Sequence, residues 1–126
     1  MILIDSCAWI EFFKGSQRGE KVWNIIKNNK SIHTSILSIA EIVTWSVSNN
    51  YPTKTILERV KMMSVMLPIS EDISAYAGRC SLLYHKSNGI GMIDALIYAT
   101  SRKNNLILLT TDNDFSGLEY VQIIDN

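Results

Sequence analysis

The stretch "GMIDALIYATSRKNNLILL", residues 91–109, predicts a helix that runs directly into a strand. The helix spans residues 92–104, and its apolar side chains recur at helical spacing: Ile93, Leu96, Ile97 and Ala99. Asn104-Asn105 then turns the chain into the apolar run at 106–109. Asp94 lies within the apolar stripe and has no basic residue three or four positions away. The sequence therefore raises the question of why a helix that faces a core carries a lone carboxylate.

Strands and helices alternate along the rest of the chain. Short apolar or β-branched runs predict strands at 2–4, 31–35, near 66–69 and at 120–124. Helices are predicted at 7–14, 17–29, 38–49, 53–66 and 71–87. This order predicts an α/β fold, a three-layer α/β/α sandwich around a mostly parallel sheet. The length of 126 residues suits one domain, residues 1–126.

The composition argues against several classes of protein. Lys plus Arg equals Asp plus Glu, 12 each, so the chain is not a polycation that grips nucleic acid by bulk charge. No apolar run has the length of a transmembrane helix, so no membrane association is expected. The start "MILIDSCAWIEFF" lacks the basic region of a signal peptide, and Cys7 and Cys80 make no disulfide framework or zinc site. A cytoplasmic location is therefore expected.

Four acidic residues lie close to the ends of predicted strands. They are Asp5, Glu41, Asp94 and Asp112, with Asp114 two residues after the last. Each has a structural alternative. Asp5 suits a helix cap, and Glu41 fits a capping box with Ser38. Asp94 lies in a first helical turn, where the helix dipole favours an anion, and Asp112 can start an Asx-turn.

The four acids together indicate more than each does alone. Ligands bind outside the carboxyl ends of the strands in parallel sheets, and these positions can converge at that edge. Converging carboxylates raise one another's pKa values, and a fold tolerates them when cations lie between them. All-oxygen ligands favour Mg²⁺ or Mn²⁺ over zinc. Because His33 and His85 lie outside these motifs, a bound metal would have to supply the chemistry.

Four segments resemble, in order and spacing, the acidic motifs of the PIN-domain ribonucleases. They are "ILIDSCAWIEFF", "SILSIAEI", "GMIDALIYATS" and "LLTTDNDF". The short length and the opening resemble most the VapC toxins of type II toxin–antitoxin pairs. The resemblance spans nearly the whole chain, and its third motif, Gly91 to Thr100, is the most specific.

The resemblance implies a role for each matching residue. Asp5, Glu41 and Asp94 match the three central metal-site acids, and Asp112 matches the fourth. Asp114 fits the motif more loosely, as a further candidate for that place. Thr110 matches a hydroxyl residue that supports the site, and Ser6 stands where the family often has Thr. Cys7 stands where Ser is common, which places one supporting hydrogen bond in doubt.

The resemblance also implies an activity and partners. It implies a Mg²⁺- or Mn²⁺-dependent endoribonuclease that cleaves single-stranded or loop RNA and forms a homodimer. A cognate VapB-like antitoxin would lay a helix and an extended tail over the active-site groove. The aromatic residues Trp9, Phe12, Phe13 and Trp45 would then be either core or part of that groove. Lys14, Arg18, Lys21, Arg102 and Lys103 would be either solvated surface or a thin basic rim for RNA.

Two alternatives stay open at this point. One is a phosphoryl-transfer α/β domain, either a receiver or a haloacid-dehalogenase-like phosphatase. A receiver would need a Lys near the last strand, and "YVQIIDN" has none. The phosphatase would need Asp-x-Asp at the first strand, where this chain has Asp5-Ser6-Cys7. The other is a non-catalytic module that only binds a partner. An activity assay separates this module from a nuclease, and a short upstream gene for a DNA-binding protein would favour the toxin.

Overall fold

A five-stranded parallel sheet forms the centre of the computed structural model, which describes residues 1–125. The strands are β1 (Ile2–Ile4), β2 (Ile32–Ser35), β3 (Val65–Leu67), β4 (Ile107–Thr110) and β5 (Val121–Ile123). They are ordered β3-β2-β1-β4-β5, and each neighbouring pair is parallel. All five carboxyl ends therefore lie along one edge of the sheet, as the predicted site requires.

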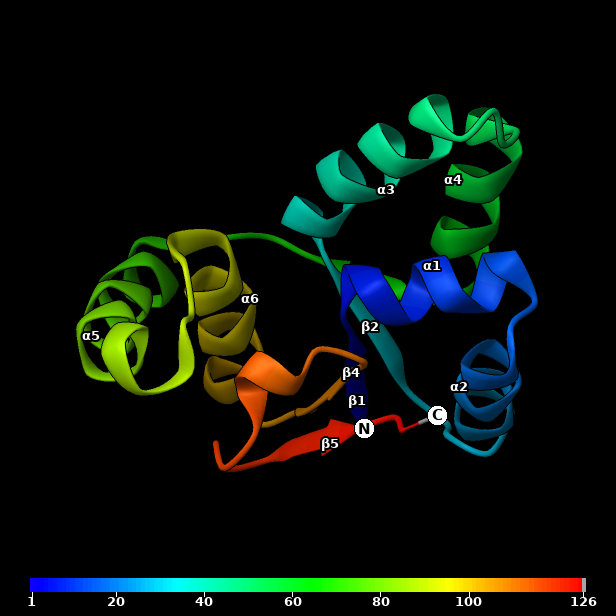
Figure 1. Cartoon of the computed structure of the whole chain (residues 1–126). Helices are drawn as coiled ribbons and strands as arrows, with labels where there is room; N and C mark the ends of the chain where they lie inside the picture. The colour runs from blue at the N-terminus through cyan, green and yellow to red at the C-terminus, as the bar shows by residue number, and fades with distance from the viewer. Residues whose placement is uncertain (126) are drawn as a thin grey trace.

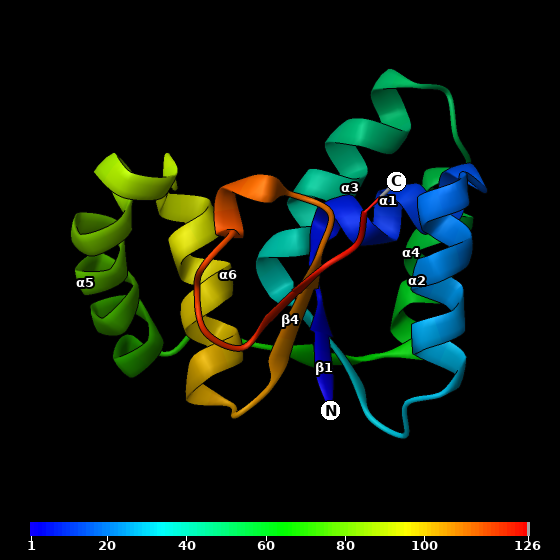
Figure 2. The ribbon, with the colours of Figure 1, turned by 60° about the horizontal axis from the view of Figure 1, so that its bottom comes forward.

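Helices cover both faces of this sheet (Figure 1). They are α1 (Ser6–Lys14), α2 (Gln17–Lys27), α3 (Ile36–Ser48), α4 (Thr53–Met63), α5 (Glu71–Asn88) and α6 (Met92–Lys103), with a 3₁₀ turn η1 (Asn113–Phe115). Figure 2 shows α5 and α6 on one side of the sheet and α1 to α4 on the other. The predicted three-layer sandwich is confirmed.

The alternation of side chains along β1 explains why both faces carry helices. Ile2 and Ile4 enter the core under α1 to α4, whereas Leu3 enters the core under α5 and α6. All three side chains are buried. A strand buried on both faces is typical of a parallel sheet with helices on each side. In residues 1–125 no helix is both long and apolar enough to cross a membrane.

The helix expected at 17–29 ends two residues early, at Lys27, where Asn28 caps it. Two further predicted helix boundaries were wrong by more than one residue. The helix expected at 38–49 begins at Ile36, because Ser35 ends β2 and caps α3. The helix expected at 53–66 ends at Met63, because Ser64 takes an extended conformation that leads into β3. Both errors arise where a strand and a helix meet with almost no loop between them.

Candidate functional site

Asp5 lies at the carboxyl end of β1, where three donors hold its carboxylate. Oδ1 accepts from the Ser6 amide at 2.8 Å, which makes Asp5 the N-cap of α1 as the structural alternative proposed. Oδ2 accepts from Thr110 Oγ1 at 2.8 Å and from Cys7 Sγ at 3.3 Å. Burial raises the pKa of Asp5, the three hydrogen bonds oppose that shift, and Glu41 adds to it. Asp5 is thus both a helix cap and an oriented, buried carboxylate.

Thr110, the last residue of β4, joins Asp5 to the next acid. The Asp5 amide donates to the Leu109 carbonyl at 2.9 Å, so pairing of the two strands places Thr110 beside Asp5. The Thr110 hydroxyl also accepts from the Asp112 amide at 3.1 Å. Asp112 Oδ1 accepts from the Asp114 amide at 2.9 Å, which confirms the expected Asx-turn. One hydroxyl therefore fixes the position of two candidate site residues.

Glu41 faces α1 and does not cap its own helix. Ser6 Oγ donates to Glu41 Oε1 at 2.6 Å across 35 positions of sequence. The alternative that paired Glu41 with Ser38 was wrong, since Ser35 Oγ accepts from the Leu37 amide and caps α3. Ser38 is buried inside the helix, and its hydroxyl has no hydrogen-bond partner within residues 1–125. Glu41 is therefore available to the site.

Asp94, in the first turn of α6, lies at the edge of the core. The side chain of Ile93 beside it is 47% exposed, so the apolar stripe does not begin where the sequence suggested. The pKa of Asp94 is raised from 3.8 to about 6, first by desolvation and then by the charges of four other acids: Asp5, Asp112, Glu41 and Asp114. Asp94 is electrostatically close to all four other acids, which answers the question that its position raised.

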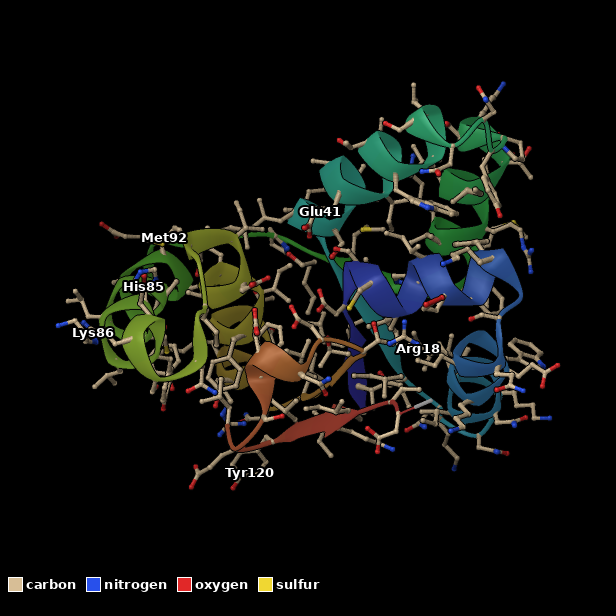
Figure 3. All side chains as sticks on the ribbon, in the orientation of Figure 1. Arg18, Glu41, His85, Lys86, Met92 and Tyr120 are labelled. Carbon is tan, nitrogen blue, oxygen red and sulfur yellow. The ribbon has the colours of Figure 1, made fainter. Side chains whose placement is uncertain are left out.

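No basic side chain neutralises this group of acids in the part of the chain that the structure describes. The ion pairs there involve only Glu11 and Asp72 as acidic partners. Figure 3 shows Arg18 on the α2 side of α1, away from Glu41. The five carboxyl groups thus share one edge of the sheet without a counter-charge from the protein, which is an arrangement that favours a bound cation.

The side chains fit a hard metal ion by their chemistry, although they do not yet surround one. Within residues 1–125 no three His, Cys, Asp or Glu side chains stand close enough together to hold an ion as placed. The electrostatic coupling nevertheless reaches Asp94 from four acids on other elements. Carboxylates that raise the pKa of a neighbouring acid in this way favour a cation between them. All-oxygen ligands suit Mg²⁺ or Mn²⁺.

An apolar groove of about 530 Å³ adjoins the acids. Ser6 and Glu41 are among its lining residues, and its apolar lining comes from α1, α3 and α6: Ile10, Leu37, Ala40, Trp45 and Ile93. Trp45 is half-buried and lies against Tyr51, with ring centroids 4.5 Å apart. Trp9, by contrast, is fully buried. Of the aromatic residues that the sequence left as core or groove, Trp9 belongs to the core, and Phe12 and Phe13 pack against it without lining the groove. Trp45 lines the groove and also packs against the core.

Most residues of the expected basic rim make local contacts. Lys14 and Arg18 pair with Glu11 at 3.5 and 2.7 Å. Lys21 Nζ donates to the Asp125 carbonyl at 2.8 Å. The Arg102 guanidinium lies 3.8 Å from the centroid of the Tyr120 ring, and Lys103 pairs with Asp72 at 3.2 Å. These contacts favour the interpretation of a solvated surface over that of a rim for RNA.

Asn88 helps to hold the site together, and the sequence did not indicate this role. Asn88 Nδ2 donates to the carbonyls of Asp114 and Ser116 at 3.0 and 2.8 Å. It thereby ties the end of α5 to the segment that carries Asp112 and Asp114. An Asn at the end of a helix reads locally as a helix stop, so no pattern in the sequence distinguishes this role.

Comparisons with known proteins agree with this architecture. The family model described as "PIN domain" matches residues 2–119. No curated protein matches the chain. A toxin–antitoxin complex from Klebsiella pneumoniae contains a chain with a TM-score of 0.83 and 20% identity, covering 100% of this chain and 99% of that one.

Two further solved structures share the fold. VapC20 of Mycobacterium tuberculosis, described as a sarcin–ricin loop cleaving toxin, has a TM-score of 0.77 and 16% identity, over 99% of this chain and 100% of its own. A chain of VapBC2 from Rickettsia felis, bound to a promoter DNA fragment, has a TM-score of 0.70 and 19% identity, over 99% and 100%. Since the family model covers most of the chain, the protein belongs to the PIN-domain family.

Proposed function

We propose that this protein is a metal-dependent endoribonuclease and the toxin of a toxin–antitoxin pair. The observation that carries the proposal is the group of five acids at the carboxyl edge of the sheet, where the pKa of Asp94 is raised to about 6 and no basic side chain of residues 1–125 pairs with it. Its fold is that of VapC20, whose description as a sarcin–ricin loop cleaving toxin makes RNA the first substrate to test.

In this proposal Asp5, Glu41, Asp94 and Asp112 hold Mg²⁺ or Mn²⁺, and Asp114 is a further candidate ligand. The bound cation would neutralise phosphoryl charge and lower the pKa of a water molecule. Thr110 and Cys7 orient the Asp5 carboxylate through its Oδ2 atom. Burial and Asp5 raise the pKa of the Cys7 thiol to about 12, so the thiol stays protonated and donates. Ser6 orients Glu41 in the same way.

The test is cleavage of a labelled structured RNA with Mg²⁺ or Mn²⁺, with EDTA, and with single-stranded DNA as a second substrate. Cleavage of RNA that depends on added metal supports the proposal, and Asp94→Asn protein purified in parallel controls for contaminating nucleases. Equal RNA cleavage in excess EDTA, or by the Asp94→Asn protein with saturating metal, would overturn it. Metal-dependent cleavage of DNA alone would keep the metal site and change the substrate.

The groove beside the acids supports a cognate VapB-like antitoxin as the partner. Its apolar lining at helical spacing on α3, from Leu37 to Trp45, suits an amphipathic helix. The related chains from Klebsiella pneumoniae and Rickettsia felis come from complexes of toxins with antitoxins. We also propose a homodimer, as the resemblance implies. Co-expression with the protein of the neighbouring reading frame, followed by size-exclusion chromatography with light scattering, tests both partners.

The phosphoryl-transfer alternative loses its support. A receiver has its strands in the order 2-1-3-4-5, whereas this sheet has the order β3-β2-β1-β4-β5. The match to the PIN family over residues 2–119 argues in the same direction. A non-catalytic partner-binding module remains the second candidate, and the cleavage assay decides between it and the nuclease.

A further inference from the structure

The charges of this neutral chain are strongly segregated. Residues 14–61 contain eight of the twelve Lys and Arg residues but only three of the twelve Asp and Glu residues, which gives this segment a formal charge of +5. Its basic residues lie at the end of α1, on α2, in the turn after α2 and on α4, and two of them, Lys14 and Arg18, pair with Glu11 just before the segment. Figure 2 shows α2 and α4 together on one side of the sheet. A basic face of this kind concentrates anions even though the net charge is zero.

A second groove, of about 460 Å³, lies between the ends of these two helices. We name it the α2–α4 groove and define it by five of its lining residues: Trp23, Lys27, Lys30, Met62 and Val65. It lies at the amino ends of β2 and β3, because Ile32 and Val65, the first residues of these strands, line it. The five acids lie at the opposite, carboxyl edge, so the two sites are separate.

Large apolar side chains of the groove are exposed to solvent, and a cluster of this kind often marks a binding site. Trp23 is 43% exposed, Met62 85% and Val65 57%. The Trp23 ring packs against Phe12, with ring centroids 5.8 Å apart and the ring planes tilted by 33°, and the rest of the ring remains partly open to solvent. Exposed indole faces bind bases by stacking, and this stacking tolerates any base.

The two lysines of the groove are available to a ligand. Lys27 and Lys30 are exposed, and within residues 1–125 neither forms an ion pair, a hydrogen bond or a cation–π contact through its ammonium group. They differ in this respect from Lys14, Arg18 and Lys21, which are engaged. Lysines flanking an exposed aromatic ring form the pattern that recognises the backbone and bases of a single strand.

We propose that the α2–α4 groove binds single-stranded RNA outside the active site, with phosphates on Lys27 and Lys30 and a base stacked on Trp23. The identity of the ligand as RNA rests on the proposed function. The groove would hold a part of the substrate distant from the cleaved bond and so contribute to the choice of substrate. An acidic protein partner would match the charge of Lys27 and Lys30 but would not explain the exposed Trp23 ring and the other exposed apolar residues of the groove.

The test measures RNA binding without cleavage. Fluorescence anisotropy of a labelled, unstructured single-stranded RNA is followed in EDTA, with all variants made in the Asp94→Asn background. Lys27→Ala/Lys30→Ala removes two exposed charges and should leave the fold intact. The matched control is Arg79→Ala/Lys86→Ala, which removes two exposed charges from α5, where Figure 3 shows Lys86 on the far side from α2. Trp23→Phe and Trp23→Ala complete the set.

We expect Lys27→Ala/Lys30→Ala to weaken binding by about tenfold and to reduce the slope of log K against log salt by about 1.4, which is roughly 0.7 for each lost phosphate contact. Trp23→Ala should lose on the order of tenfold, as expected for one stacked base. Quenching of tryptophan fluorescence by RNA should disappear in Trp23→Phe. The control on α5 should bind like the parent.

Three results would overturn the inference. The first is unchanged affinity and salt dependence in the Lys27→Ala/Lys30→Ala variant. The second is an equal loss in the α5 control, which would indicate an effect of net charge only. The third is normal RNA binding with a changed oligomeric state, which would make the groove a protein interface. Failure of the proposed function would be seen in a different assay. The parent protein would then cleave no RNA in the cleavage test, whether or not it binds RNA in the anisotropy test.

Discussion

Asp94 is the residue on which the chemistry depends most. Its pKa is raised from 3.8 to about 6, first by desolvation and then by four acids on other elements. A raised pKa means that the folded protein takes up a proton more readily than the unfolded chain. The contribution of Asp94 to the free energy of unfolding is therefore complete at low pH and is lost as the pH rises through about 6.

This linkage predicts a specific pH dependence of the metal-free protein. In EDTA, the Tm difference between Asp94→Asn and the parent should grow in favour of the variant as the pH rises from 3.8 to about 6, and should then level off. Asp5, whose pKa is also raised, acts in the same direction and is present in both proteins. Calorimetry of the two proteins across this range measures the effect. A difference that does not change with pH would show that Asp94 titrates normally.

Metal should reverse this order of stability. A cation at 100-fold above its Kd stabilises the folded parent by about 2.7 kcal/mol through mass action. Asp94→Asn loses one ligand charge and should gain much less from Mn²⁺. An acid that served only the helix dipole would lose about 0.3–1 kcal/mol on neutralisation and would show no metal dependence. Melting curves with and without Mn²⁺ distinguish the two roles, and equal shifts in both proteins would contradict the metal site.

Helices and strands were largely predictable, whereas the contacts between them were not. The strands at β1 and β4 followed from short apolar runs, and α6 from its helical spacing. The link from Ser6 to Glu41 joins residues 35 positions apart, and no local pattern contains it. Local motifs can also mislead. Ser38 and Glu41 fit the pattern of a capping box, but the residue that caps α3 is Ser35, three positions earlier.

The cap residue Ser35 and the buried Ser38 allow this point to be measured. Ser35→Ala removes the helix cap and should lower the free energy of unfolding by about 0.5–2 kcal/mol. Ser38→Ala removes a buried hydroxyl that has no partner in residues 1–125 and should be neutral or stabilising. Urea denaturation of both variants tests the assignment. A larger loss in Ser38→Ala than in Ser35→Ala would restore the capping box that the sequence suggested.

The fold as a whole places two tryptophans in different environments. Trp9 is fully buried, and its Nε1 donates to Thr34 Oγ1 at 3.0 Å. Trp9→Ala should therefore cost roughly 3–5 kcal/mol of stability, as expected for a large core aromatic residue. Trp45 is half-buried at the groove, so Trp45→Ala should cost clearly less. Equal losses in urea denaturation would place Trp45 in the core.

Trp45 also tests whether one surface serves both inhibition and catalysis. The groove that it lines is also lined by Ser6 and Glu41, so a helix bound there would lie against Glu41 and block access to the acids. Trp45→Ala leaves every acid in place. We therefore expect this variant to cleave RNA at a rate close to that of the parent but to need on the order of tenfold more antitoxin for half-inhibition, since hot-spot aromatics contribute more than about 1.4 kcal/mol.

Thr44→Ala is the matched control. Thr44 also lines the groove, but its hydroxyl donates to the Ala40 carbonyl, so this variant should be inhibited like the parent. Inhibition curves for the three proteins measure this, and unchanged inhibition of Trp45→Ala would mean that the partner binds elsewhere.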